Sequence, residues 1–175
     1  MSLMSPPRDG IYYFAYGSNM HEGRLRERVP SARSIGVALL RGYRLRWHKK
    51  SKTDGSGKCD IELSPELDAM VYGVLFKFSL HEKEELDRFE GLRGGYDEKP
   101  VEVKVGEGSL MVSTYFATKT SANLKPFTWY KAYVVNGARQ HQLPPDYIAF
   151  LEETEADQDP DTDRHHKNMA LADRF

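Results

Sequence analysis

The sequence predicts a single mixed α+β domain over residues 11–154. Its 175 residues suit one domain of moderate size. Hydrophobic residues make up 39% and charged residues 29%, which is ordinary for a globular protein. The predicted strands outnumber the predicted helices and do not alternate regularly with them, so a doubly wound parallel sheet is disfavoured.

The first predicted element is a short aromatic strand at residues 11–17, Ile-Tyr-Tyr-Phe-Ala-Tyr-Gly. Gly17, Ser18 and Asn19 then interrupt it, and a short helix is predicted from His21, with Ser18 or Asn19 as N-cap and Pro30 beyond its end. The interruption is either an ordinary turn or a place where the backbone bends around a ligand.

The middle and end of the chain contain further strands, two helices and polar segments. Residues 32–50 predict one long strand or two strands around Gly42, and residues 51–58 predict a polar loop. Strands are predicted at Met70–Phe78, 101–105 and 110–117, the last two joined by a Gly-Glu-Gly turn. Two helices, separated near Leu143-Pro144, complete the domain. Residues 1–10 are expected to be disordered or part of a tag, and residues 155–175 to form a mobile polar tail.

The helix predicted before Gly91 ends in a carboxylate. Ser79 and Glu82 fit a capping box at its start, and Gly91 fits the C-terminal stop. At about 100° per residue, Glu90 lies roughly 40° from Leu86, at the border of the apolar stripe. The helix dipole disfavours a carboxylate there by roughly 0.3–1 kcal/mol. Glu90 is therefore a candidate for proton transfer; the alternative is a surface glutamate at a frayed helix end.

Composition and incomplete motifs exclude several classes of function. With 25 basic and 26 acidic residues the net charge is -1, so no bulk field attracts nucleic acid. No apolar run is long enough to span a bilayer, and the N-terminus lacks a signal-peptide core, so we expect a cytoplasmic protein with no membrane partner. Cys59, the single cysteine, excludes an internal disulfide and a thiolate metal cage.

Three motif-like segments also fail on inspection. Residues 55–58, Gly-Ser-Gly-Lys, lack the upstream glycine and the following Ser or Thr of a phosphate-binding loop. Ser18 lacks the flanking glycines of a nucleophile elbow. The alternate aspartates from Asp157 to Asp163 lack the Gly and Glu that complete a calcium loop. No metal site is predicted.

Two segments together resemble the γ-glutamylcyclotransferase family. Residues 12–20 read Tyr-Tyr-Phe-Ala-Tyr-Gly-Ser-Asn-Met, and residues 86–91 read Leu-Asp-Arg-Phe-Glu-Gly. That family carries a Tyr-Gly-Ser-Asn loop after its first strand and a catalytic Glu followed by Gly at the end of a later helix. The similarity runs from about Tyr12 to Tyr147 and includes Tyr96 and the Tyr130-Lys131 pair.

The resemblance implies a small mixed β-barrel with short flanking helices and a cavity at one end. It implies a reaction in which the α-amine of a γ-glutamyl group attacks its own γ-carbonyl, giving 5-oxoproline and a released amino acid or amine. Glu90 would act as base and then as acid, without metal or organic cofactor, and a homodimer is expected because relatives are often dimers. The implied substrate-binding residues are Tyr13, Phe14, Ala15, Tyr16, Gly17, Ser18, Asn19, Tyr96 and Tyr130.

Alternatives remain open for the residues and for the function. Core packing could account for Tyr13 or Tyr16, a turn contact for Asn19, and helix packing for Tyr130. A related cyclotransferase could act on γ-glutamylamines, glutathione or an antibiotic intermediate. A non-catalytic module could bind a small acidic metabolite, and a serine hydrolase would use Ser18.

Overall fold

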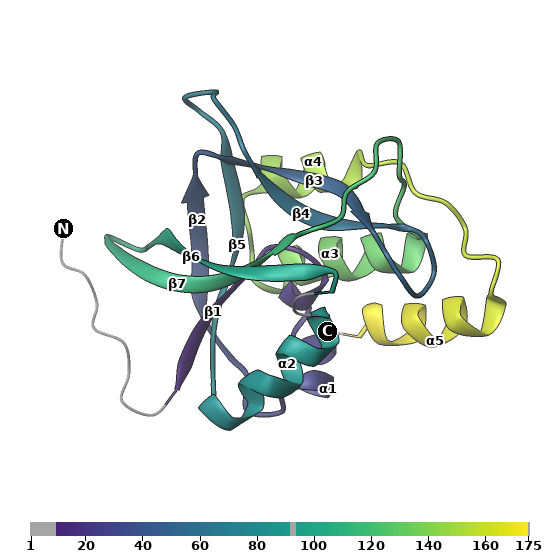
Figure 1. Cartoon of the computed structure of the whole chain (residues 1–175), viewed down its shortest axis with the longest axis horizontal. Helices are drawn as coiled ribbons and strands as arrows, with labels where there is room; N and C mark the ends of the chain where they lie inside the picture. Colours follow the sequence, from purple (N-terminus) through teal and green to yellow (C-terminus); the bar gives the residue numbers. More distant parts are fainter. Residues whose placement is uncertain (1–9, 92–93, 175) are drawn as a thin grey trace.

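A closed five-stranded barrel forms the centre of the protein (Figure 1). The computed structural model describes residues 10–91 and 94–174. The barrel order is β1-β5-β2-β6-β7, with bounds β1 (Ile11–Ala15), β2 (Arg33–Arg41), β5 (Met70–Phe78), β6 (Tyr96–Val105) and β7 (Gly108–Ala117). Neighbouring strands are antiparallel except where the parallel pairing of β1 with β7, Tyr13 opposite Ser113, closes the barrel. The expected mixed α+β barrel is confirmed.

A separate two-stranded hairpin lies beside the barrel. Its strands are β3 (Tyr43–Lys50) and β4 (Gly57–Leu63), and they pass across helix α3 (Thr128–Gln140) in Figure 1. Gly42 has φ 83°, a left-handed conformation that favours glycine, and it separates β2 from β3. Residues 32–50 therefore form two strands, whereas β4 was not predicted.

Short helices follow β1 and precede β6. A 3-10 turn η1 (Ser18–Met20) leads into α1 (Glu22–Arg28), whose N-cap is His21 and not Ser18 or Asn19. A second 3-10 turn η2 (Leu80–Glu82) leads into α2 (Lys83–Glu90), and the predicted capping box is wrong because Ser79 makes no side-chain cap. Gly91 ends α2 with φ 62°, as expected.

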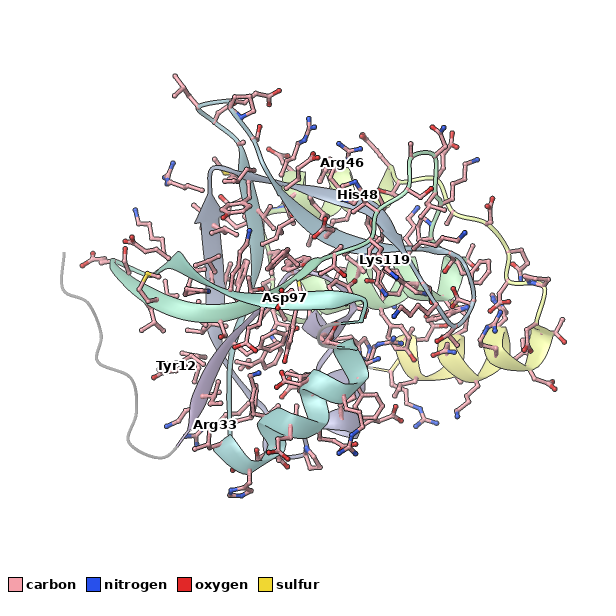
Figure 2. The ribbon with its side chains drawn as sticks, viewed as in Figure 1. Tyr12, Arg33, Arg46, His48, Asp97 and Lys119 are labelled. Carbon is pink, nitrogen blue, oxygen red and sulfur yellow. The ribbon has the colours of Figure 1, made fainter. Side chains whose placement is uncertain are left out.

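The core fills the barrel and continues from it to helix α3. The alternation of β1 is visible at Tyr12 and Tyr13: Tyr12 projects outward in Figure 2, whereas Tyr13 is 6% exposed. Phe14, Phe76 and Tyr133 are almost completely buried. Strand β1 therefore has both faces covered near its end, which explains its unbroken aromatic composition.

The C-terminal segment differs from the polar tail that the sequence suggests. After α4 (Pro145–Glu152), residues 162–172 form α5 (Thr162–Ala172). Ala172 is buried in the core, and Met169 and Leu171 pack against it. Met169 and Ala172 lie three positions apart and share a helix face. These few apolar residues stand in an otherwise polar segment, so composition alone conceals the helix. The expectation for residues 1–9 lies outside the described residues.

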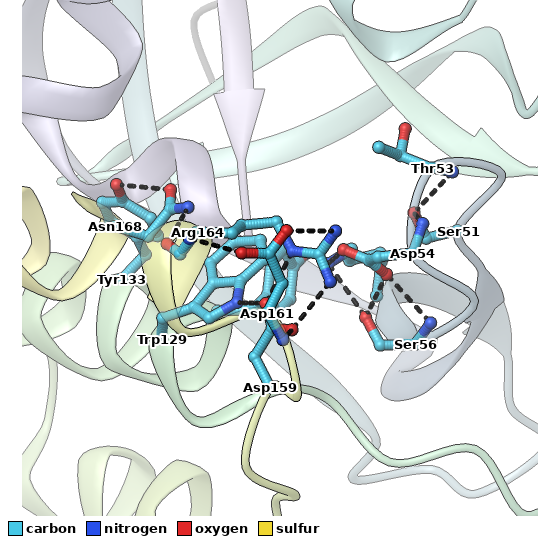
Figure 3. A network of polar contacts seen from close by, with 12 residues as sticks. Ser51, Thr53, Asp54, Ser56, Trp129, Tyr133, Asp159, Asp161, Arg164 and Asn168 are labelled. Atoms are coloured by element: carbon cyan, nitrogen blue, oxygen red, sulfur yellow. Dashed lines mark hydrogen bonds and ion pairs between the residues drawn. The ribbon is translucent and has the colours of Figure 1, made fainter. Parts of the chain in front are cut away.

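A buried ion pair anchors the start of α5. Asp159 accepts hydrogen bonds from Trp129 Nε1 at 2.8 Å and from Arg164 Nη2 at 2.7 Å. Figure 3 shows Arg164 between Asp159 and the β3–β4 loop that carries Asp54 and Ser56. Of the alternate aspartates, Asp159 is thus an ion-pair partner and Asp161 is the N-cap of α5.

Two structural features are absent from residues 10–91 and 94–174. No three His, Cys, Asp or Glu side chains gather into a group that could hold a metal ion. None of the helices in these ranges has the length and apolar content needed to cross a membrane.

Candidate active site

A hollow opens where β1 ends and η1 begins. It measures about 300 Å³ up to its open mouth. Residues from β1, η1, β4, α2, β6, β7 and α3 surround it, namely Tyr13, Tyr16, Gly17, Ser18, Asn19, Cys59, Glu90, Tyr96, Tyr115 and Tyr130. The structure therefore brings the glycine-containing turn and the candidate carboxylate to one cavity.

Glu90 faces this hollow from the last turn of α2. Its side chain is 13% exposed, and Oε1 accepts a 2.7 Å hydrogen bond from Asn19 Nδ2. Arg28 Nη1 lies 3.6 Å from the same oxygen. The neighbouring Phe89 is 53% exposed and does not line the hollow. Glu90 is thus a positioned carboxylate and not a frayed surface residue.

Asn19 connects three side chains of the site. Its Nδ2 also lies 3.2 Å from Tyr13 Oη, and its Oδ1 accepts a 3.0 Å hydrogen bond from Arg28 Nη1. Because a guanidinium can only donate, Arg28 fixes which end of the amide faces it, and the NH₂ group must face Glu90. Asn19 therefore does more than pin the turn: it orients the carboxylate.

Gly17 allows the turn to pack closely against the opposite wall. Its backbone angles, φ -115° and ψ -138°, are not in the left-handed region. A Cβ at this position would lie 3.0 Å from Cys59 Cβ and 3.3 Å from Tyr130 Oη. The strand therefore ends in glycine because β4 and α3 approach the backbone here.

Hydrogen bonds to β4 and β7 hold the tyrosine rings of the hollow. Tyr96 Oη donates to the Cys59 carbonyl at 2.8 Å, and Tyr130 Oη accepts from the Cys59 N–H at 3.0 Å. Tyr16 Oη donates to the Tyr115 carbonyl at 2.6 Å. Burial raises the pKa of Tyr96 and of Tyr130, so both remain neutral hydroxyls. Tyr16 and Tyr130 thus combine packing with exposure of one face to the cavity.

Two of the expected binding residues do not line the hollow. Phe14 and Ala15 are 0% exposed. The Phe14 carbonyl accepts a hydrogen bond from Thr114 Oγ1 at 2.9 Å, and Ala15 pairs opposite Val74 of β5. They belong to the core because the barrel covers both faces of β1, so their assignment to the pocket is corrected.

Two lining residues, Cys59 and Tyr115, were not among the expected site residues. Burial raises the pKa of the Cys59 thiol, so it stays protonated at neutral pH and is a poor nucleophile. Tyr115 lies on β7, which reaches the site only because β7 pairs with β1. No local pattern in the sequence signals that pairing.

Human γ-glutamylcyclotransferase is 31% identical to this chain over 158 residues, which cover 87% of the chain and 83% of the human protein. The chain belongs to the γ-glutamylcyclotransferase family. Bovine γ-glutamylcyclotransferase is likewise 31% identical, over 159 residues with the same coverage. The AIG2-like family model matches residues 70–151, a range that contains Glu90, Tyr96 and Tyr130.

A solved structure of a γ-glutamyl cyclotransferase shares the fold of this family member. It superposes with a TM-score of 0.79 at 30% identity, covering 85% of this chain and 90% of the other. The protein is therefore homologous to γ-glutamylcyclotransferase enzymes, and both the family and the fold expected from the two sequence segments are confirmed.

Proposed function

We propose that the protein is a γ-glutamylcyclotransferase, which converts γ-glutamyl amino acids or amines to 5-oxoproline and a released amino acid or amine. The observation that supports this most directly is the position of Glu90. Its carboxylate, held by Asn19, faces the same hollow as the Gly17 turn.

The proposed reaction needs one group that both removes and returns a proton. At neutral pH the substrate's α-amine is largely an ammonium, which cannot attack. Glu90 takes a proton from it, and the amine nitrogen forms a bond to the γ-carbonyl carbon. When the bond from that carbon to the departing nitrogen breaks, Glu90 returns this proton to the departing nitrogen. The second proton that the attacking nitrogen loses on becoming the lactam N–H also passes to the departing group, which leaves as an ammonium. Acid–base transfer of this kind is typically worth about 10²–10⁴-fold in rate.

The rest of the hollow would supply orientation and stabilise charge. The substrate contains both reacting groups, so holding it folded lowers the entropic part of the barrier. Backbone amides at Gly17, Ser18 and Asn19 are the proposed donors to the substrate carboxylate or to the oxyanion that develops on the γ-carbonyl. Tyr96 and Tyr130 would form the opposite wall.

The test is to incubate purified protein with γ-glutamyl-alanine and to measure 5-oxoproline by chromatography. Wild type should form the lactam, and Glu90→Gln should lose at least about 100-fold in kcat. Glu84→Gln is the matched control, because Glu84 is an exposed glutamate on the same helix and should leave kcat unchanged. Equal activity of Glu90→Gln and wild type would remove Glu90 from this role.

The same assay separates the alternatives. A binding module would yield no 5-oxoproline from wild type while still binding the dipeptide in calorimetry. Serine hydrolysis would release free glutamate, and Ser18→Ala would abolish it. A panel containing glutathione and γ-glutamyl-lysine would show which departing group is preferred.

A further inference from the structure

The hollow opens into a wider vestibule. This vestibule encloses about 1070 Å³, including its open side, and it shares Ser18, Glu90, Tyr96 and Tyr130 with the hollow. Glu90 therefore stands at the boundary between the two spaces. If the γ-glutamyl group occupies the inner hollow, the group that departs must occupy the vestibule.

Positive charge is concentrated around the vestibule. Six of its cationic side chains come from α1, β3, β4, α5 and the β3–β4 loop: Arg24, Arg28, Lys49, Lys52, Lys58 and Arg164. Among the described residues only two carboxylates, Asp54 and Glu90, line the same space. Since the whole chain carries a net charge of only -1, this excess of positive charge is local.

Two of these cations lie opposite each other on the two strands of the hairpin. Lys49 of β3 lies directly opposite Lys58 of β4 in the strand register. Like charges at opposed positions of a hairpin are unfavourable. Lys58 has a partner in Asp54 at 3.2 Å, whereas Lys49 is 8% exposed and has no carboxylate within 4 Å in the described ranges. Glu90 and Asp54 attract Lys49 only from beyond this distance. A nearly buried cation without a close counter-ion is costly unless an anion joins it.

The two lysines reach different walls of the vestibule. Lys49 Nζ lies 4.7 Å from the ring centroid of Tyr96 on β6. Lys58 Nζ lies 4.4 Å from the ring centroid of Trp129 on α3. Arg24 stands beside Lys58, 5.7 Å from the same indole ring, and its buried Nε has no hydrogen-bond partner in the described part of the chain. The vestibule therefore presents two separate cationic positions, one at Lys49 and one at Arg24 and Lys58.

An ordinary amino acid that leaves the γ-glutamyl group brings one carboxylate, which would occupy one of these positions. The other position calls for a second negative charge. We infer that the departing group is an acidic amino acid, so that the favoured substrates are γ-glutamyl dipeptides whose second residue has a side-chain carboxylate. This inference rests on the proposed cyclotransferase function and specifies its substrate class.

The experiment compares γ-glutamyl-glutamate with γ-glutamyl-glutamine, two dipeptides of nearly equal size that differ by one charge. At low salt, kcat/KM for 5-oxoproline formation should be at least about 10-fold higher for γ-glutamyl-glutamate, because the two cationic positions each contribute. The ratio should fall toward unity as sodium chloride is raised, since salt screens such interactions.

Variants then assign the ratio to the two lysines. Lys49→Gln and Lys58→Gln should each lower the ratio several-fold, chiefly through KM for γ-glutamyl-glutamate. Because both dipeptides are measured on the same protein sample, partial misfolding of a variant cancels in the ratio. Lys104→Gln is the matched control: Lys104 is exposed on β6 and lines no part of the vestibule, so it should preserve the ratio.

The outcomes separate this inference from the proposed function. A wild-type ratio of one or below, or a ratio that neither vestibule variant changes, would overturn the inference while turnover of both dipeptides still supports the cyclotransferase. If no dipeptide is cyclised, the proposed function is overturned. Calorimetry on the two dipeptides then tests the preference for an acidic second residue. Equal affinities overturn that preference, and tighter binding of γ-glutamyl-glutamate supports it.

Discussion

Asn19 Nδ2 donates a 2.7 Å hydrogen bond to Glu90 Oε1, joining residues that are 71 positions apart in the chain. The bond links the turn after β1 to the last residue of α2. Arg28 fixes the orientation of the amide from the other side, through its 3.0 Å hydrogen bond to Asn19 Oδ1. The proposed base is therefore held by a partner whose own orientation is determined.

Asn19→Ala should lower kcat for γ-glutamyl-alanine by roughly 10- to 100-fold, because a hydrogen bond to a charged group is worth about 1.5–3 kcal/mol. KM should change less, since the hollow keeps its tyrosine walls. Steady-state kinetics measures both constants. Asn168→Ala, on α5 and bonded to Tyr133, is the control and should keep the wild-type kcat. Equal losses in the two variants would point to general destabilisation and against a positioning role for Asn19.

Strong local signals explain the parts of the fold that the sequence predicts well. The apolar run at Met70–Phe78 became β5 with the expected bounds, and Gly91 ends α2 in a left-handed conformation. Both signals act over a few residues, through burial or through backbone sterics. Glu90 was found for the same reason, since its helix position follows from the stop at Gly91.

Contacts between distant segments explain what the sequence did not predict. Strand β4 was missed although residues 58–63 alternate polar and apolar types. That its Cys59 reaches the hollow, however, depends on where the β3–β4 hairpin packs. The Asn19–Glu90 hydrogen bond and the β1–β7 closure depend on where whole elements pack. The cationic vestibule arises in the same way, from α1, the β3–β4 hairpin and α5.

Gly137→Ala should destabilise the protein and reduce its activity. A Cβ at Gly137 of α3 would lie 2.5 Å from the backbone nitrogen of His21 and 2.7 Å from the carbonyl carbon of Met20. These are backbone atoms, so η1 itself would have to move. Overpacking costs about 1–3 kcal/mol, which exceeds the gain of about 1 kcal/mol in helix propensity. Because η1 carries Asn19, kcat should fall as well.

Urea unfolding followed by circular dichroism measures the stability change of Gly137→Ala. Gly36→Ala is the matched control, since a Cβ there would meet only Val105 Cγ1 at 3.9 Å, an ordinary contact. Its midpoint should stay at the wild-type value or rise. A urea midpoint for Gly137→Ala above the wild-type value would contradict the prediction, because η1 would then have moved without loss of stability.

Asp159→Asn should remove an acid-sensitive part of the stability. The hydrogen bonds from Arg164 hold the pKa of Asp159 below its ordinary value of 3.8. A carboxyl whose pKa is lowered by folding stabilises the native state above its unfolded pKa, and this stabilisation is lost as the pH falls toward the folded value. At neutral pH the variant should therefore lose about 2 kcal/mol, and the difference from wild type should shrink below about pH 4.

Chemical denaturation from pH 3 to pH 7 tests this dependence on Asp159. Asp163→Asn is the control, because Asp163 lies exposed in the first turn of α5 and contributes less than about 1 kcal/mol through the helix dipole. A stability difference for Asp159→Asn that stays constant over this range would contradict the role of the ion pair with Arg164.

Raising the pH should weaken the proposed preference for acidic departing groups. Burial lowers the pKa of Lys58 to about 8, while Asp54 opposes this and the nearby Arg24 and Lys49 reinforce it. Lys58 is charged below this pH and neutral above it, so one vestibule cation is lost as the pH rises from 7 to 9. The kcat/KM ratio of γ-glutamyl-glutamate to γ-glutamyl-glutamine should fall roughly 3-fold over this range, since one partly screened ion pair is worth about 0.2–1 kcal/mol.

Both dipeptides share the same α-amine and the same Glu90, so the ratio cancels the pH dependence of the chemical step. In Lys58→Gln the ratio should be lower at pH 7 and nearly independent of pH; a wild-type slope retained in that variant would assign the titration to another group.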